Sequence, residues 1–190
     1  MTLFVGLGNP GSQYEETRHN IGFKVIDALV EELGARDISK NAFYGELYRT
    51  TSTLFLKPTT YMNLSGKSVL PVKQFFKVDI EDIIVIHDDI DLPFGALRFK
   101  RGGGHGGHNG LKSIDAVIGR EYLRVRIGVG KPERKSQVAD YVLHDFTQEE
   151  KRMLPALITH VKEACVALQR YELNEVKSRF SLKSAEVLER

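Results

Sequence analysis

The residues of this chain best suited to acid–base chemistry are one histidine near the N-terminus and two aspartates in the middle. His19 lies in the polar run Thr17–Asn20, ahead of the first apolar helical pattern. Asp88 and Asp89 follow directly after the apolar run Ile83–His87. A carboxylate that accepts a hydrogen bond from one imidazole nitrogen leaves the other nitrogen free to act as a base. Either aspartate could fill that role; a surface histidine and loop-capping carboxylates are the alternative interpretation.

Three asparagines add neutral polar groups to this set. Asn9, Asn63 and Asn109 each lie beside Gly or Ser at a turn or a strand-to-helix position. An amide offers a donor and an acceptor without charge, so it can orient a water or donate to a developing oxyanion. Asparagines at such positions are also common turn and cap residues. Because no nucleophile for an acyl-enzyme accompanies them, the set predicts hydrolysis by an activated water.

A glycine-rich stretch, Gly102–Gly110, has six glycines in nine residues. Backbone without side chains can lie close to a ligand and offer its N–H groups to it. Residues 98–135 contain ten Lys or Arg and three acids, a local charge of +7 in a chain whose net charge is +2. This concentration predicts contact with a polyanion such as nucleic acid. A flexible linker and a solvated basic face are the alternatives.

Three further motifs do not fit the cofactor sites that they resemble. Gly6–Gly11 matches the dinucleotide pattern, but its proline stiffens the turn and no acid follows at the end of a second strand. Gly66–Ser68 resembles the end of a phosphate-binding loop, yet Tyr61 stands where that loop needs glycine. His105 and His108 could bind a metal, but no third ligand is evident. We therefore expect no cofactor and no metal.

The composition is that of an ordinary globular domain, with 190 residues of which 42% are hydrophobic. The single cysteine, Cys165, excludes an intramolecular disulfide, fits a reducing compartment and falls in a helical apolar pattern typical of a core residue. No apolar run reaches the roughly 18 residues needed to span a bilayer, and Met1–Val5 does not resemble a signal peptide. We expect a cytoplasmic protein.

Strand and helix patterns alternate along the chain. Strands are expected at residues 3–6, 44–49, 53–57, 83–87, 96–100 and 123–129, the second and third forming a hairpin. Helical spacing of apolar residues is found in 25–33, in 69–76, in 111–118 and after a capping box at 147–150. The pattern predicts an α/β fold, a single domain over residues 1–190 with a twisted mixed central sheet flanked by helices. Ligands in such folds bind at the carboxyl ends of strands.

Five segments together resemble the bacterial peptidyl-tRNA hydrolase family, in order and with near-family spacing from about residue 3 to about residue 180. These segments are Gly6–Gly11, Thr17–Asn20, Thr60–Gly66, His87–Pro93 and Gly102–Gly110. The resemblance implies a metal-independent, cofactor-free esterase that acts as a monomer. Its substrate would be peptidyl-tRNA, bound through the acceptor arm and terminal nucleotides, and it would cleave the ester between the peptide and the terminal ribose.

The resemblance also implies roles for individual residues. His19 resembles the base that activates water, and Asp88, rather than Asp89, resembles the carboxylate that supports it. Asn9 matches the position that separates N-blocked from free aminoacyl-tRNA through the peptide backbone. Asn63 and Asn109 match positions that bind the tRNA end and place the water or the oxyanion.

Aromatic and channel residues follow from the same resemblance. Tyr14 and Tyr61 match positions that contact the tRNA end, where an aromatic ring can stack on a base or ribose. Met62 and Gly106 would line the channel for the peptide.

The remaining contacts that the resemblance implies are made by basic residues. The resemblance also covers two segments whose composition indicates no role. Lys100 and Arg126 match positions associated with tRNA phosphates, and Arg98 stands where lysine is common in the family. Residues 137–146 correspond to a segment thought to act as a lid. Residues 181–190 are variable in the family, and we expect them to fray.

Two other functions are consistent with parts of the sequence. A non-catalytic RNA-binding module of the same fold would explain the basic window equally well, but it needs no general base. An enzyme with a nucleotide cofactor would rest on the glycine fingerprint alone.

Overall fold

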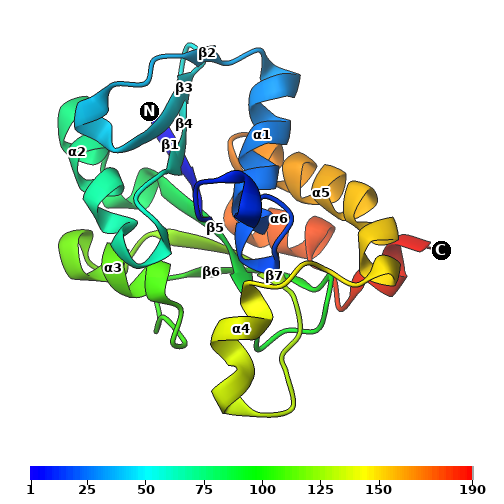
Figure 1. Cartoon of the computed structure of the whole chain (residues 1–190). Helices are drawn as coiled ribbons and strands as arrows, with labels where there is room; N and C mark the ends of the chain where they lie inside the picture. Colours follow the sequence, from blue (N-terminus) through cyan, green and yellow to red (C-terminus); the bar gives the residue numbers. More distant parts are fainter. Residues whose placement is uncertain (190) are drawn as a thin grey trace.

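The computed structural model describes residues 1–189, in which seven strands form one mixed sheet in the order β2-β3-β4-β1-β5-β7-β6 (Figure 1). The central strands β4, β1, β5 and β7 are parallel, and the outer pairings β2–β3, β3–β4 and β7–β6 are antiparallel. The strands are β1 (Thr2–Gly6), β2 (Arg36–Asp37), β3 (Gly45–Arg49), β4 (Thr53–Pro58), β5 (Ile83–Asp89), β6 (Leu97–Arg101) and β7 (Leu123–Gly128).

Helices cover both faces of the sheet. On one face lie α1 (Ile21–Leu33), α5 (Gln148–Leu168) and α6 (Leu173–Phe180), and on the other lie α2 (Gly66–Phe76) and α3 (Asn109–Ile118). The short α4 (Val138–Val142) lies beyond the end of the sheet (Figure 1). The α/β class with a mixed central sheet between helices is thus confirmed.

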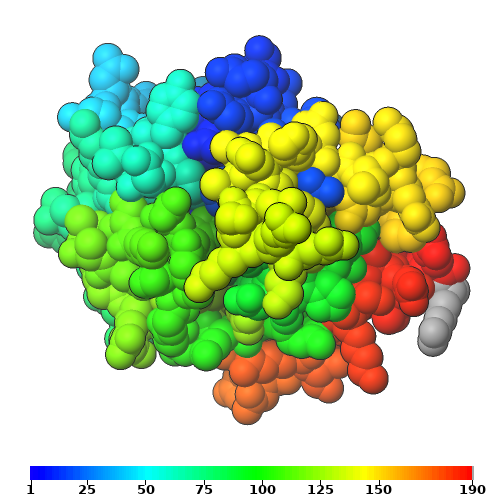
Figure 2. Space-filling view, turned by 60° about the horizontal axis from the view of Figure 1, so that its bottom comes forward, coloured from blue at the N-terminus to red at the C-terminus, as the bar shows by residue number. Residues whose placement is uncertain are grey.

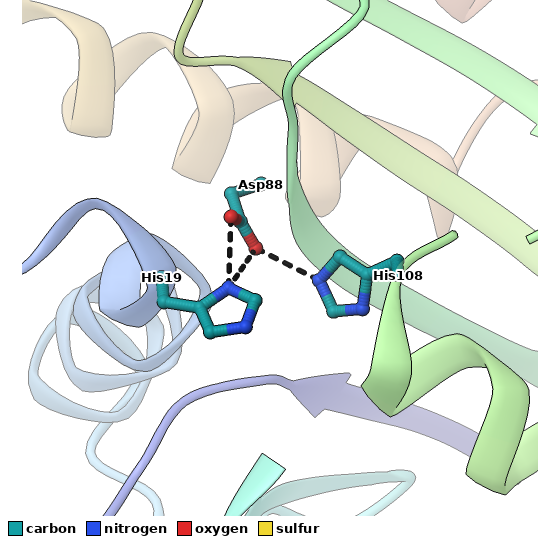
Figure 3. Close-up of side chains that lie close together, drawn as sticks. All are labelled: His19, Asp88 and His108. Carbon is teal, nitrogen blue, oxygen red and sulfur yellow. Dashed lines mark hydrogen bonds and ion pairs between the residues drawn. The ribbon is translucent and has the colours of Figure 1, made fainter. Parts of the chain in front are cut away.

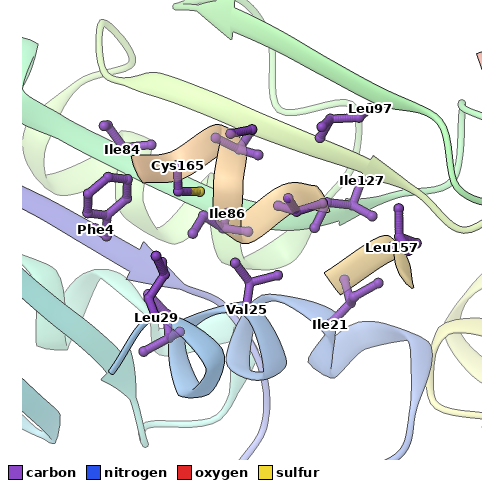
Figure 4. Close-up of a cluster of buried hydrophobic side chains, with 14 of the residues drawn as sticks. Phe4, Ile21, Val25, Leu29, Ile84, Ile86, Leu97, Ile127, Leu157 and Cys165 are labelled. Carbon is purple, nitrogen blue, oxygen red and sulfur yellow. The ribbon is translucent and has the colours of Figure 1, made fainter. Parts of the chain in front are cut away.

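Two hydrophobic cores result from the alternation of side chains along the buried strands. Phe4, Ile84 and Ile86 point toward α1 and α5, whereas Val5 and Val85 point toward α2 and α3. Figure 4 shows the first core, with side chains of α1 and α5 meeting those of the strands. The single cysteine is fully buried there, as expected of a core residue.

Local signals at helix ends are found where the sequence places them. Gly34 ends α1 with φ of 60°, a left-handed conformation that favours glycine. The Thr147 side chain accepts from the Glu150 N–H at the start of α5, and the Glu150 side chain accepts from the Thr147 N–H. These reciprocal bonds form the predicted capping box.

The expectation that residues 181–190 fray is wrong for residues 181–189, and Arg190 lies outside the described residues. Leu182 pairs with Leu97 of β6, and the Ala185 N–H donates to the Phe94 carbonyl at 3.0 Å. Leu182 and Ala185 are both buried. The backbone of Leu182 exchanges both hydrogen bonds with Leu97, and so pairs part of the edge strand β6 that would otherwise be free.

The parallel strands bring several loops to one edge of the sheet. The loops after β1 and β4, the end of β5 and the end of β7 all lie there. In the space-filling view the yellow segment that contains α4 projects over the green segment of residues near 100 (Figure 2). Within residues 1–189, no helix is both long enough and apolar enough to cross a bilayer.

Substituting Gly22 by Ala tests the packing that places α1 on the sheet. A Cβ at Gly22 would lie 2.5 Å from the Ile86 carbonyl oxygen and 2.5 Å from the Leu7 nitrogen, both backbone atoms. Because backbone cannot move aside cheaply, we expect G22A to lower the free energy of unfolding by about 3 kcal/mol in a urea titration. G34A is the control: its Cβ meets nothing within 4 Å, and only the left-handed φ costs about 1 kcal/mol. Equal losses in the two variants would contradict the packing argument.

Candidate functional site

The carboxylate of Asp88 bonds to the imidazole of His19 at the carboxyl end of β5. His19 Nδ1 lies 2.8 Å from Asp88 Oδ2 and 3.0 Å from Oδ1 (Figure 3). The His19 side chain is 11% exposed and that of Asp88 is 1% exposed. His19 is held in a 3-10 turn, Arg18–Asn20, that leads directly into α1. The structure therefore brings together two residues that are distant in the sequence.

A second imidazole, His108, binds the same carboxylate. His108 Nε2 lies 2.8 Å from Asp88 Oδ1, and its Nδ1 accepts from the N–H groups of Gly110 (3.1 Å) and Leu111 (3.3 Å). This side chain is thus the N-cap of α3. Because Nδ1 is an acceptor, the proton of the neutral ring is on Nε2, which donates to Asp88. The sequence pattern indicates His108 only as a possible metal ligand and gives no sign of this role.

The charge of Asp88 follows from these partners. Burial alone would raise the pKa of this carboxyl group, but the nearby imidazoles and their N–H donors hold the pKa of Asp88 well below its ordinary value. The ionised carboxylate accepts the Nδ1 proton of His19, so Nε2 of that ring carries the lone pair. Figure 3 shows Nε2 of His19 pointing away from Asp88. This is the arrangement of a histidine that serves as a base.

The same three side chains could also be read as a metal site. One donor atom from each of His19, Asp88 and His108 lies within 4.8 Å of the others. However, a metal on His108 Nε2 would displace its proton, and the ring would then have to protonate the Nδ1 that caps α3 or become an anion. The cap therefore favours a hydrogen-bonded network over a metal centre.

A third imidazole, His87, lies beneath this network. It is buried, its Nδ1 lies 2.8 Å from the Asp88 carbonyl oxygen, and its ring centre is 5.3 Å from that of His108. Burial is the main cause that lowers the pKa of His87 to about 4, and repulsion from His108 acts in the same direction whenever that ring is protonated. The ring therefore stays neutral near pH 7 and donates from Nδ1.

A chain of amides connects the His19 turn to Asn9. The Asn20 side chain accepts from the Asn9 N–H and donates to the Asn9 carbonyl, both at 2.9 Å. Asn9 Oδ1 in turn accepts from the Met62 N–H at 2.7 Å. Because the side-chain oxygen of Asn9 already accepts a hydrogen bond, its Nδ2 group is the donor that can bind a ligand. Asn20, which the sequence analysis did not single out, sets the position of Asn9.

The segment after β4 is strained where it meets Asn9. Tyr61 has φ of 65° and ψ of 154°, a region that costs a residue other than glycine about 1–3 kcal/mol. Its exposed ring packs edge-on against Tyr14, with ring centres 6.3 Å apart. Asn63 follows and is exposed, whereas Met62 is buried. The exposed Tyr61 ring and the half-buried Tyr14 ring thus form one aromatic surface beside Asn9.

A cavity of about 460 Å³ opens next to His19. The predicted site residues that line it are His19, Asp88, Lys100, Gly106, Asn109 and Arg126. Val138, Ala139 and Val142 of α4 form part of its wall. Arg126 donates from Nε to Asp89 Oδ2 at 2.8 Å, so the second aspartate pairs with an arginine and the first with histidines.

Arg98 is not brought to this cavity. It lies on β6, and its guanidinium donates to the carbonyl oxygens of Leu97 and Leu182. The guanidinium thus holds the C-terminal segment on the edge of the sheet.

The segment 137–146 is tied through Arg18 to the turn that holds His19. The Arg18 guanidinium lies 4.0 Å from the centre of the Tyr141 ring and donates to the Tyr141 carbonyl at 3.1 Å. The Arg18 N–H donates to the His144 carbonyl at 3.1 Å, and Thr17 pairs with Asp145. The residue before His19 therefore fixes the segment that covers the cavity.

The fold and the site together define an α/β protein with a buried His–Asp pair beside a cavity that Lys100 and Arg126 help to line, as is found in hydrolases. Comparison with known proteins identifies the family. The family model for peptidyl-tRNA hydrolase matches residues 3–187. The chain belongs to the peptidyl-tRNA hydrolase family, and it is accordingly an enzyme of the carboxylic-ester hydrolase class.

Individual relatives agree over the whole length. Peptidyl-tRNA hydrolase of Sulfurovum sp. (strain NBC37-1) is 75% identical over 189 residues, 100% of both chains. That of Wolinella succinogenes is 58% identical over 186 residues, 96% of each chain. The crystal structure of peptidyl-tRNA hydrolase from Acinetobacter baumannii matches with a TM-score of 0.92 at 36% identity, covering 97% of this chain and 96% of that chain.

The low pKa of His87 predicts how stability depends on pH. The unfolded chain protonates this histidine near pH 6.5 and the folded chain near pH 4, so the unfolded state binds more protons between these values. His87 therefore contributes a loss of stability as the pH falls from about 6.5 to about 4, with a slope of up to about 1.4 kcal/mol per pH unit.

His87→Asn tests this linkage, because the Asn amide can keep the donor at the Nδ1 position but does not titrate. Urea unfolding between pH 4.5 and 7.5 should give a shallower pH slope for H87N than for the wild-type protein. Parallel slopes would show that His87 is not the group that titrates.

Proposed function

We propose that this enzyme hydrolyses the ester between a peptide, or another N-blocked aminoacyl group, and the terminal ribose of tRNA, with a water activated by His19 and no covalent intermediate. The observation that carries the proposal is the 2.8 Å bond between His19 Nδ1 and the ionised Asp88, which leaves Nε2 as a base beside the cavity. The family membership supports the ester and the substrate.

The chemical steps follow from these positions. Nε2 of His19 takes a proton from water while the water oxygen bonds to the ester carbonyl carbon. Asp88 stabilises the imidazolium that forms, and Asn109 or Asn63 or a backbone N–H donates to the oxyanion. When the tetrahedral intermediate collapses, the ribose oxygen leaves and receives the proton from His19. The products are free tRNA and a peptide carboxylate.

Asn9 would distinguish blocked from free substrates. Its Oδ1 is bound to Met62, so Nδ2 is the group that can donate to a carbonyl of the substrate. An N-acylated substrate supplies an amide carbonyl that a free aminoacyl-tRNA lacks. Met62 and Gly106 would line the channel for the peptide that carries this carbonyl.

The remaining residues would contact the tRNA. Tyr14 and Tyr61 offer an aromatic surface for the terminal nucleotides. Asn63 follows Tyr61 closely in the chain, and Asn109 offers its amide from the wall of the cavity. Lys100 and Arg126 would attract phosphates at the cavity. A monomer that binds the acceptor arm in the cytoplasm, with no membrane contact and no obligate protein partner, completes the proposal.

The direct test is release of free tRNA from N-acetyl-aminoacyl-tRNA, measured beside the unblocked aminoacyl-tRNA with EDTA present. Cleavage of the blocked substrate alone is expected. Tight, salt-sensitive binding of both with no cleavage of either would overturn the proposal and leave a binding module.

Removing the His19 imidazole should abolish most of the turnover. We expect H19A to lower kcat by roughly 10²–10⁴-fold with substrate binding retained, because general-base catalysis contributes about that much. D88N should lower kcat and change the pH profile. H160A is a control, since that histidine bonds to the Phe180 carbonyl away from the site. Turnover by H19A close to that of H160A would remove His19 from the mechanism.

Asn9→Asp tests the discrimination between substrates. An aspartate keeps an oxygen for the Met62 N–H but has no Nδ2 donor. We expect kcat/KM for the N-acetyl substrate to fall about tenfold, the size of one uncharged hydrogen bond, with a smaller effect on the unblocked substrate. An unchanged ratio between the two substrates would contradict the role of Nδ2.

A further inference from the structure

A buried arginine, Arg124 on β7, holds the carbonyl groups of the glycine-rich loop. One guanidinium nitrogen donates to the carbonyl oxygens of Gly103 (2.9 Å) and Gly104 (2.6 Å). The other terminal nitrogen lies 3.3 Å from Asp115 Oδ1 and 3.2 Å from the Tyr122 hydroxyl. The residue is 2% exposed, so the loop rests on a charge inside the protein.

Packing alone does not explain this charge. Buried ion pairs are costly to desolvate, and apolar residues of similar volume often replace them without loss of stability. Within residues 1–189, Nε of Arg124 is buried and has no acceptor. The arrangement thus costs stability, and one terminal nitrogen of Arg124 fixes the shape of the loop while the other bonds to Asp115 and Tyr122.

Holding these two carbonyls determines where two N–H groups point. No peptide bond of the described chain is cis, and in a trans peptide the N–H is directed opposite to the C=O. Because the Gly103 and Gly104 oxygens both face Arg124, the N–H groups of Gly104 and His105 face the other way. Neither has an acceptor within residues 1–189, and both residues are exposed. Gly103, with φ of 92°, permits the turn.

The charges around this pair favour an anion. The ammonium of Lys100 lies beside the loop, 3.0 Å from the position that a Cβ of Gly103 would take. Carboxylates of Glu121 and Asp91 lie beside Gly102 and Gly106, on either side of the pair. An anion is therefore accepted at the centre of the loop and repelled at its ends. The charged donor behind each carbonyl also polarises the peptide groups and strengthens their N–H donors.

We propose that the N–H groups of Gly104 and His105, aligned by Arg124 and assisted by Lys100, form a backbone nest that binds one phosphate of the tRNA strand. The proposal rests on the function given above, because it names which phosphate-binding groups that substrate would meet. Arg124 is a positioning residue: it bonds to the loop carbonyls, and the backbone N–H groups bind the ligand.

The nest is tested by titrating the 15N-labelled protein with inorganic phosphate and, separately, with a trinucleotide that has the tRNA 3′-terminal sequence. The amide protons of Gly104 and His105 should move downfield and saturate. The Gly107 amide, already bonded to His105 Nδ1 at 3.0 Å, should move less. Shifts no larger than those caused by chloride at equal ionic strength would overturn the proposal.

Kinetics of Arg124→Lys separate phosphate binding from chemistry. Lysine keeps the charge but cannot hold two carbonyls and Asp115 together. We expect KM for the N-acetyl-aminoacyl-tRNA to rise about tenfold with kcat within twofold of wild type. Arg101→Lys is the matched control, since Arg101 donates to the carbonyls of Glu81 and Glu121. A fall in kcat at unchanged KM would assign the N–H groups to the reacting ester and overturn the phosphate assignment.

Failure of this inference is distinguishable from failure of the proposed function. Saturable phosphate shifts at Gly104 and His105 in a protein that does not cleave the blocked substrate would support the nest and reject the hydrolysis. Cleavage of the blocked substrate without such shifts would support the hydrolysis and reject the nest. If R124K does not fold, the titration of the wild-type protein decides.

Discussion

The site depends on one buried carboxylate that accepts hydrogen bonds from two imidazoles. Asp88 is held at the end of a strand that is covered on both faces, so it cannot move to solvent to regain hydration. Its charge is stabilised by His19 and His108, and in return it orients both rings. The second imidazole occupies Oδ1 of this carboxylate, so that His19 and His108 share one acceptor group.

Three consecutive residues connect this pair to the rest of the substrate site. Arg18 stacks on Tyr141 and fixes the segment that covers the cavity, His19 bonds to Asp88, and Asn20 sets the backbone of Asn9. The 3-10 turn that contains them leads directly into α1, which is packed against β1 and β5 without space for a single added methyl group at Gly22. A displacement of α1 would therefore disturb the contacts of Arg18, His19 and Asn20 at once.

Much of this arrangement could be predicted from local patterns, and the rest depends on tertiary contacts. The apolar run of β5 and the capping box of α5 are local signals, and both elements form where expected. The segment of α4 has five residues with a single buried one, and contacts with the Arg18 turn hold it, so its sequence carries little periodicity. The prediction that residues 181–190 fray rests on their variability in the family that the chain resembles, and the packing of Leu182 and Ala185 beside β6 leaves no pattern in the sequence itself.

The candidate site also combines features that local patterns predict with features that depend on tertiary contacts. Because ligands in α/β folds bind at the carboxyl ends of strands, the sequence predicts that His19 lies near an aspartate. Asp88 and Asp89 are neighbours whose side chains point to opposite faces of the sheet, and the pattern does not show which of them meets His19. Asp88 meets the histidines and Asp89 meets Arg126. His108 gave no signal as a partner, since histidine is an uncommon N-cap residue, and buried Arg124 was one basic residue among ten. Both could be recognised only once the loop between β6 and α3 had been placed.

The most direct test of the Asp88 network is the protonation of each ring nitrogen, measured by 15N NMR of the histidine side chains at neutral pH. The account predicts a proton on Nδ1 and a lone pair on Nε2 for His19, and the opposite tautomer for His108. A His19 ring with its proton on Nε2 would contradict the account, because that nitrogen could not then accept a proton from water.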